Sequence, residues 1–166
     1  RKRVPAMLKA FGVLGVLAGV LTVPAPGADA QRARGGRLAT FPTAQLSIKA
    51  ASGRHDFTVE IARTGQQQTQ GLMYRRRMAA NAGMLFVYRR VGPVSMWMRN
   101  TYIPLDMLFI RADGKIAHIA QRTVPQSLET ISSPEPVKSV LELNAGTAAR
   151  LKLKIGDLVS SSALGR

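Results

Sequence analysis

The chain has 166 residues, a formal net charge of +15 and no cysteine. This length fits one domain, and the absence of cysteine excludes disulfides, thiol nucleophiles and cysteine-ligated metal sites. The positive charge would attract an anionic polymer of the cell envelope, although a solvated basic shell is the interpretation we favour. No nucleic-acid-binding motif accompanies the charge and aromatic residues make up only 5% of the chain, so specific nucleic-acid binding is not expected.

The first 30 residues have the pattern of a secretory signal. Basic residues up to Lys9 precede an apolar run that ends at Val23, and a small-x-small site ends at Ala30. We therefore expect residues 1–30 to be a cleaved signal peptide and the protein to be exported, either periplasmic or extracellular. An uncleaved signal is the alternative and the only membrane contact we expect. Residues 31–42 are polar and contain glycines, which predicts a disordered tether.

Residues 43–162 are predicted to form a single domain of short strands. Alternating apolar and polar residues predict a hairpin of strands at 46–48 and 57–61. A weak capping box, Thr64 with Gln67, predicts a short helix from Gln66 to about Met78, which either breaks at Gly71 or admits a neighbouring segment there. Further strands are expected at 84–88, 94–99, 105–110, 115–120, 139–143 and 158–160, with Asp113-Gly114 as a hairpin turn and a second short helix at 145–154 that Asn144 caps.

The segment from Gly92 to Arg111 contains the only tryptophan and a polar cluster between two apolar runs. Pro104 lacks an amide hydrogen, which predicts a turn at 100–104. Asp106 stands in the second apolar run, where a buried carboxylate is costly unless it is paired. We therefore expect Asp106 to accept hydrogen bonds from the turn or from a nearby arginine, with Arg99 the nearest in sequence.

These elements predict an α+β fold that is predominantly β. We expect a compact small barrel or a strongly curved sheet, antiparallel or mixed, of about seven strands with two short helices. The long loop at 122–137 is predicted to be a functional flap rather than a simple connection. The protein is expected to be a monomer without a cofactor.

Several groups of residues, in their order along the chain, resemble the domain of unknown function 192 family. The groups are Gly71-Leu72-Met73 followed by Arg75 or Arg76, Gly83 to Val87, Trp97 to Thr101 with Ile103 to Asp106, Val140 to Glu142 with Ala145-Gly146, and Gly156-Asp157. The family usually has lysine at the position of Arg99, and acidic residues where this chain has glutamines at 66–68. The resemblance implies a compact, mainly β fold with short helices, and it implies no established reaction.

Our main functional hypothesis is a binding site for a small or polymeric ligand of the cell envelope around the loop 99–106. Aromatic and thioether groups would supply contact area, and polar groups would fix the orientation of the ligand. The predicted ligand-binding residues are Met73, Arg75, Trp97, Arg99, Asn100, Thr101, Asp106 and Glu142. The structural alternative is that Trp97 and the methionines are core, with Asp106 and Arg99 as a buried pair that holds the loop.

Three other functions are considered. A hydrolase could use Asp106 and Glu142 as its catalytic carboxylate pair, since no serine-triad motif is present. A copper(I) site could use Met73, Met84, Met96, Met98 and Met107, but methionines in apolar runs are more typical of core packing, so no metal is expected. A purely structural envelope protein could act through its basic surface alone.

Overall fold

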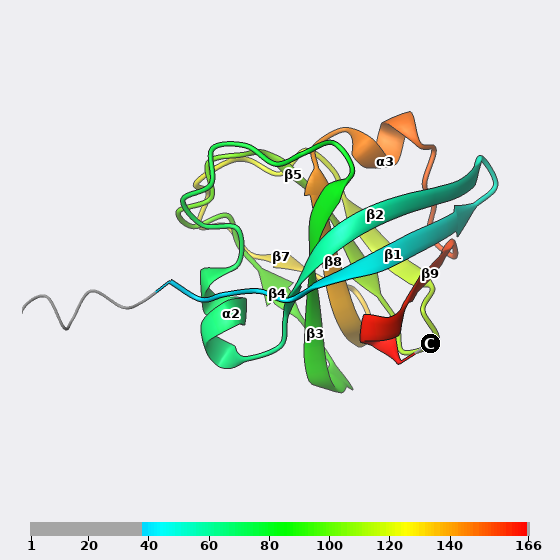
Figure 1. Ribbon diagram of the computed structural model, residues 1–166, viewed down its shortest axis with the longest axis horizontal. Coiled ribbons are helices and arrows are strands. Elements are labelled where there is room, and N and C mark those ends of the chain that lie inside the picture. Colours follow the sequence, from blue (N-terminus) through cyan, green and yellow to red (C-terminus); the bar gives the residue numbers. More distant parts are fainter. Residues whose placement is uncertain (1–37, 166) are drawn as a thin grey trace, which may run out of the picture. The chain divides into compact units, whose positions relative to one another are not determined.

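Seven strands form one curled sheet in the computed structural model, which describes residues 38–165 (Figure 1). The order across the sheet is β6-β5-β8-β3-β2-β1-β9. The strands are β1 (Thr43–Ala50), β2 (Gly53–Ala62), β3 (Ala82–Gly92), β5 (Leu105–Ile110), β6 (Ile116–Ala120), β8 (Val137–Asn144) and β9 (Leu158–Ser161). The predicted signal peptide and residues 31–37 of the predicted tether lie outside the described residues.

The sheet is mixed and nearly closes on itself. β2 and β3 pair in parallel, and the other neighbouring strands pair antiparallel. The two edge strands approach each other, because Lys115 bridges to Leu158 and the Val159 amide donates to the Gly114 carbonyl at 2.9 Å. The predicted fold class, a predominantly β domain built on a strongly curved sheet, is confirmed.

Side chains alternate between the two faces of the sheet and form two cores. The inner core receives side chains from all seven strands, including Ile48, Leu108 and Leu141. The outer core covers the other face of the middle strands, where residues such as Phe86 and Met107 pack against residues that follow α2 and β4. The face on which a residue lies therefore decides which core or surface it can reach.

Helix α2 (Gly65–Gln70) begins as predicted and ends early. The Thr64 hydroxyl accepts from the Gln67 amide at 3.2 Å, and the Gln67 side chain accepts from the Thr64 amide at 3.0 Å, which confirms the capping box. Of the two alternatives at Gly71, the structure takes the break, so the helix does not extend to Met78. The chain leaves the helix at Gly71, which has a φ of +47° and lies so close to the Phe86 ring that an added Cβ would come within 3.0 Å of it.

The second helix, α3 (Thr147–Arg150), is also shorter than predicted. Asn144 does not cap it, because this residue is the last of β8 and its amide donates to the carbonyls of Met78 and Ala79 at 3.1 and 3.0 Å. Gly146 occupies the N-cap position instead. A third element, the 3-10 helix η1 (Ser162–Leu164), follows β9.

Only part of the predicted strand at 94–99 is a strand. β4 (Ser95–Met96) pairs with β7 (Ile131–Ser132), which divides the predicted long loop at 122–137. The chain then turns at Asn100, which has a φ of +54°. Residues 39 and 40, expected in the tether, hydrogen-bond to side chains of α2. Among residues 38–165, no helix has the length and apolar character needed to cross a membrane.

Candidate functional site

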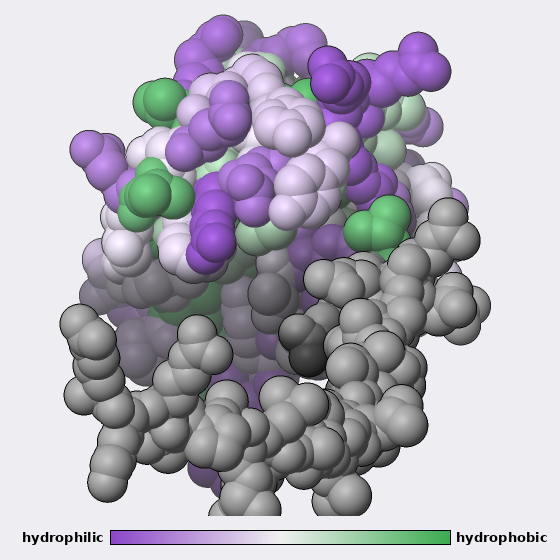
Figure 2. Space-filling model, turned by 90° about the vertical axis from the view of Figure 1, so that its left-hand side faces the viewer, coloured by the Kyte–Doolittle hydropathy of each residue, from purple (hydrophilic) through white to green (hydrophobic). Residues whose placement is uncertain are grey.

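A cleft of about 410 Å³ lies between α2, the middle of the sheet and the segment that contains β4. We name it the Glu142 cleft after the only acidic residue in its lining. Figure 2 views the molecule from the α2 side, where strongly hydrophilic side chains are interspersed with near-neutral ones and hydrophobic ones are scattered. Five of the eight predicted ligand-binding residues line this cleft: Met73, Trp97, Arg99, Thr101 and Glu142.

Glu142 lies on β8 in the middle of the sheet. Its register neighbours are Met84 on β3 and Met107 on β5, and both are fully buried. The Glu142 side chain is only 4% exposed, and none of the hydrogen bonds or ion pairs among the described residues involves its carboxyl group. Burial without a compensating donor raises the pKa of Glu142 to about 8, so the group is mainly protonated at neutral pH.

Tyr88 lines the cleft beside Glu142. Its hydroxyl donates to the sulfur of Met96 at 3.3 Å. Burial, followed by the charge that Glu142 carries when ionised, raises the pKa of Tyr88, so the phenol stays neutral. The inner part of the cleft therefore combines a carboxyl group, a phenol and thioether surface.

The rim of the cleft is built from the segment that follows β4. The Trp97 side chain is 47% exposed, and the Arg99 guanidinium lies 5.4 Å from the centre of its ring. Thr101 is buried, and its hydroxyl donates to the Arg99 carbonyl at 3.2 Å. Trp97 is therefore not a core residue, as the structural alternative assumed. It lines the same cleft as Glu142, another of the predicted ligand-binding residues.

Asn100 supports this segment without lining the cleft. Its amide donates to the Tyr74 hydroxyl at 3.1 Å and approaches the Met73 sulfur at 3.9 Å. The Asn100 carbonyl also accepts from the Tyr74 backbone amide at 2.8 Å. The residue thus ties the turn after β4 to the turn after α2, and both turns contribute to the cleft.

Asp106 is fully buried and lies away from the cleft. Its two carboxylate oxygens accept from the backbone amides of Arg122 at 2.9 Å and Ala148 at 2.8 Å. The predicted pairing with Arg99 is wrong, and the turn at 100–104 does not supply the donors either. Asp106 instead joins β5 to the segment after β6, through the Arg122 amide, and to α3, through the Ala148 amide.

Asp106 and Glu142 face opposite sides of the sheet. Asp106 is opposite Leu143 in the β5–β8 register, and Met107 is opposite Glu142. Residues that are opposite each other share a face, and consecutive residues on a strand do not. The two acids therefore do not form the carboxylate pair that the hydrolase alternative requires.

Arg75, another predicted ligand-binding residue, has a partner of its own. Its guanidinium forms a bidentate pair with Glu60, with distances of 2.5 and 2.7 Å, and it lies 5.8 Å from the centre of the Phe41 ring. Arg75 is not among the residues that line the Glu142 cleft. The structure thus uses this arginine to attach the turn after α2 to β2 and to the segment before β1.

The five methionines considered for a copper site divide into two groups. Met84, Met98 and Met107 are buried core residues, whereas Met73 and Met96 line the cleft. Within residues 38–165, no group of three or more His, Asp or Glu side chains is placed to hold a metal ion. Met84 and Met107 flank Glu142 within the core, and Met73 and Met96 give the cleft polarizable, apolar surface.

Sequence reasoning missed several residues of the cleft. Gln68 and Tyr88 line it, together with Phe86 and Met96. Tyr88 is the last residue of the apolar run in β3. This position at the end of a core strand could have identified it as a residue near a site. Gln68 carried no signal in the sequence. Its side-chain amide donates to the Val87 carbonyl at 3.1 Å, and no sequence pattern distinguishes such a glutamine from an exposed one.

Residues 47–161 match the model of the DUF192 family, described as "Uncharacterized ACR". A crystal structure of a Sinorhizobium meliloti 1021 protein, described as a "putative transcription regulator", is 49% identical with a TM-score of 0.73 and covers 75% of this chain and 98% of its own. A Novosphingobium aromaticivorans protein of unknown function is 37% identical with a TM-score of 0.71 and covers 77% and 95%. No curated protein matches the chain. The family match spans most of the chain, and the protein belongs to the DUF192 family.

Proposed function

We propose that the protein binds a hydroxyl-rich ligand of the cell envelope, a saccharide, in the Glu142 cleft. The observation that carries the proposal is the buried carboxyl group that has no hydrogen-bond partner among the described residues and lines an open cleft. Among the described residues, the Ser139 hydroxyl is the only side-chain group that is both sealed off and without a partner, so the Glu142 carboxyl oxygens are open to the cleft. Water or a ligand in the cleft can therefore bond to this carboxyl group, and a ligand with hydroxyl groups would supply the hydrogen bonds that the fold does not.

The chemistry of the cleft supports a saccharide as the ligand. A protonated carboxyl group donates and accepts, as sugar hydroxyls also do. The half-exposed Trp97 offers an amphipathic aromatic surface at the rim, and the volume of about 410 Å³ is in the range of small-ligand sites. The export signal expected at residues 1–30 supports an envelope location for such a ligand.

Trp97 makes the proposal directly testable, because it is the only tryptophan in the chain and lies at the rim of the cleft. Titration with oligosaccharides of the bacterial envelope should change its fluorescence in a saturable way. Glu142→Met places a side chain of similar size between Met84 and Met107, so it should preserve the fold and weaken binding at least about tenfold.

Glu142→Gln should retain binding within a few fold, because an amide also donates and accepts. Glu129→Gln removes an exposed acid outside the cleft and serves as the matched control. Unchanged affinity in Glu142→Met, or no response of the wild-type protein to any saccharide, would reject the proposal.

The description of the Sinorhizobium relative raises nucleic-acid binding as a second candidate, which the net charge of +15 also favours. In the described residues the two α-helices have six and four residues, which offers no long recognition helix for the major groove. Anisotropy of a labelled DNA duplex separates the candidates. Tight duplex binding that survives Glu142→Met would favour the second one.

A further inference from the structure

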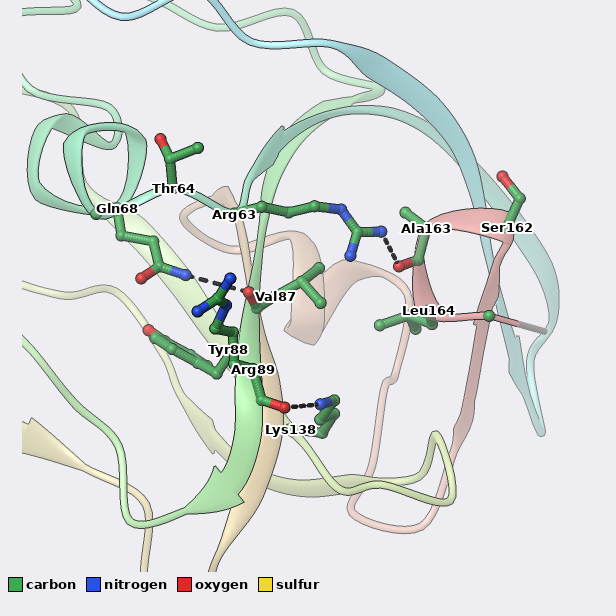
Figure 3. Close-up of a pocket in the computed structure, with 12 residues that line it drawn as sticks. Arg63, Thr64, Gln68, Val87, Tyr88, Arg89, Lys138, Ser162, Ala163 and Leu164 are labelled. Atoms are coloured by element: carbon green, nitrogen blue, oxygen red, sulfur yellow. Dashed lines mark hydrogen bonds between the residues drawn. The ribbon is translucent and has the colours of Figure 1, made fainter.

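A second cleft, of about 1030 Å³, lies between α2, β3, β8 and η1 (Figure 3). We name it the basic cleft, because Arg63, Arg89 and Lys138 line it and no acidic residue does. None of these three cations was a predicted site residue. Arg63 directly follows β2, Arg89 lies on β3 and Lys138 lies on β8, so the fold brings together three charges that are far apart in the sequence.

Two of these cations are held in place by neutral groups. The Arg63 guanidinium donates to the Ala163 carbonyl, and the Lys138 ammonium donates to the Arg89 carbonyl at 2.7 Å (Figure 3). Within the described part of the chain, none of the ion pairs involves Arg63, Arg89 or Lys138. The carbonyls orient the cations without neutralising them, so the cleft keeps an uncompensated positive charge that favours an anion.

The basic cleft adjoins the Glu142 cleft. Gly65, Gln68 and Tyr88 line both of them. The Gln68 amide donates to the Val87 carbonyl at 3.1 Å, which holds this side chain at the boundary between the two clefts (Figure 3). A ligand longer than one sugar ring could therefore occupy both clefts at once.

We infer that the basic cleft is a subsite for the anionic groups of the same ligand, which makes that ligand an acidic glycan. The inference rests on the proposed function, since it assumes that a saccharide occupies the Glu142 cleft. Nucleic acid fits the basic cleft less well, because Tyr88 is its only aromatic residue and is half-buried with its hydroxyl bonded to Met96. Base stacking needs exposed aromatic faces, whereas carboxylates need only the cations.

The test compares acidic sugars with their uncharged forms. Hexasaccharides of galacturonate, mannuronate and hyaluronan are each titrated in two forms, with Trp97 fluorescence and calorimetry as readouts. The first form, called the free acid, is unesterified and carries ionised carboxylates at neutral pH, and the second is the methyl ester. The ester keeps the hydroxyl groups and removes the charge. We expect the wild-type protein to bind at least one free acid about tenfold more tightly than its ester, with a preference that falls as salt rises.

The double variant R89Q/K138Q should reduce that preference to about twofold or less, because it weakens binding of the free acid much more than binding of the ester. The matched control is R150Q/K152Q. It removes two cations from a third cleft, which is lined by Arg150, Lys152 and Lys154 and shares no residue with the Glu142 cleft. The control should keep the full preference, which separates a specific subsite from a general effect of net charge.

The outcomes distinguish the two proposals. Equal binding of acid and ester in all three pairs, or the same loss of preference in both double variants, overturns the anionic subsite and leaves the saccharide proposal standing. No binding of either form by the wild-type protein overturns both. Binding of single-stranded (dT)12 more tightly than every free acid, with sensitivity to R89Q/K138Q, would overturn the glycan and assign the cleft to nucleic acid.

Discussion

Asp106 and Glu142 are both buried in the same sheet on adjacent strands, and they differ in their surroundings. Asp106 faces the inner-core side and accepts two backbone hydrogen bonds. Glu142 faces the outer-core side, has no partner among the described residues and lines a cleft. A buried acid whose donors are supplied by the fold belongs to the architecture, whereas a buried acid that lacks them beside an opening is a candidate for ligand binding.

The largest effect we predict is a pH dependence of stability that comes from Glu142. Its pKa is about 8 in the folded protein, against an ordinary value of 4.5. Between these values the folded protein holds a proton that the unfolded chain has lost, so the free energy of unfolding falls as pH rises. At about 1.4 kcal/mol per pKa unit, the loss between pH 4.5 and 8 should be about 4 kcal/mol.

Denaturant unfolding of the wild type and of Glu142→Gln at pH 5, 6.5 and 8 measures this dependence. The variant cannot ionise at this position, so the difference in unfolding free energy should shift in its favour as pH rises. A difference that stays constant from pH 5 to pH 8 would show that Glu142 gains a partner in solution, and the comparison with Asp106 would then fail.

The next effect is the loss of stability in Asp106→Ala. The substitution leaves the buried amide of Ala148 and the partly buried amide of Arg122 without an acceptor, at about 1–3 kcal/mol for the buried one and less for the other, so we expect a loss of about 3 kcal/mol. Saccharide affinity should not change, because Asp106 lies on the other face of the sheet. Asp56→Ala is the control. Asp56 pairs with Arg54 at the surface, where both side chains are more than half exposed, so its loss should cost less than about 1 kcal/mol.

A measurable fall in saccharide affinity in Asp106→Ala, at a temperature where the variant is fully folded, would contradict this division of roles. Unfolding free energies from denaturant titration and fluorescence titrations of Trp97 give the two quantities on the same samples. The free energy of unfolding should fall in Asp106→Ala, and the saccharide affinity should stay the same.

Local signals in the sequence predict the elements well. The apolar run at 105–110 is β5, the Asp113-Gly114 pair lies in the turn before β6, and Thr64 with Gln67 starts α2. The sequence marked Gly71 as a possible break in α2 but left the alternative open, because the close approach of the Phe86 ring to this position joins residues that are distant in sequence. Helix propensity has no information about such a contact.

The site was predicted only in part, because local sequence patterns do not show which distant residues come together. Five of eight residues gather in one cleft because four of them lie in two turns that Asn100 ties together, and the fifth faces them from the sheet. Whether Asp106 and Glu142 share a face depends on the register between β5 and β8. A one-residue change of register would exchange the faces, and no short motif specifies the register of strands so far apart.

The smallest effect we predict extends the comparison from acids to arginines. Arg75 pairs with Glu60, and their side chains are 32% and 28% exposed. Arg75→Ala should therefore cost only about 1 kcal/mol of stability and leave saccharide affinity unchanged. Arg76→Ala, which removes a guanidinium stacked 5.8 Å from the Tyr102 ring, is the matched control and should cost less. Arg75→Ala could instead weaken saccharide binding while the variant's free energy of unfolding stays within about 1 kcal/mol of the wild type. A residue with a partner inside the fold would then also take part in ligand binding. The presence or absence of such a partner would no longer distinguish the roles of Asp106 and Glu142.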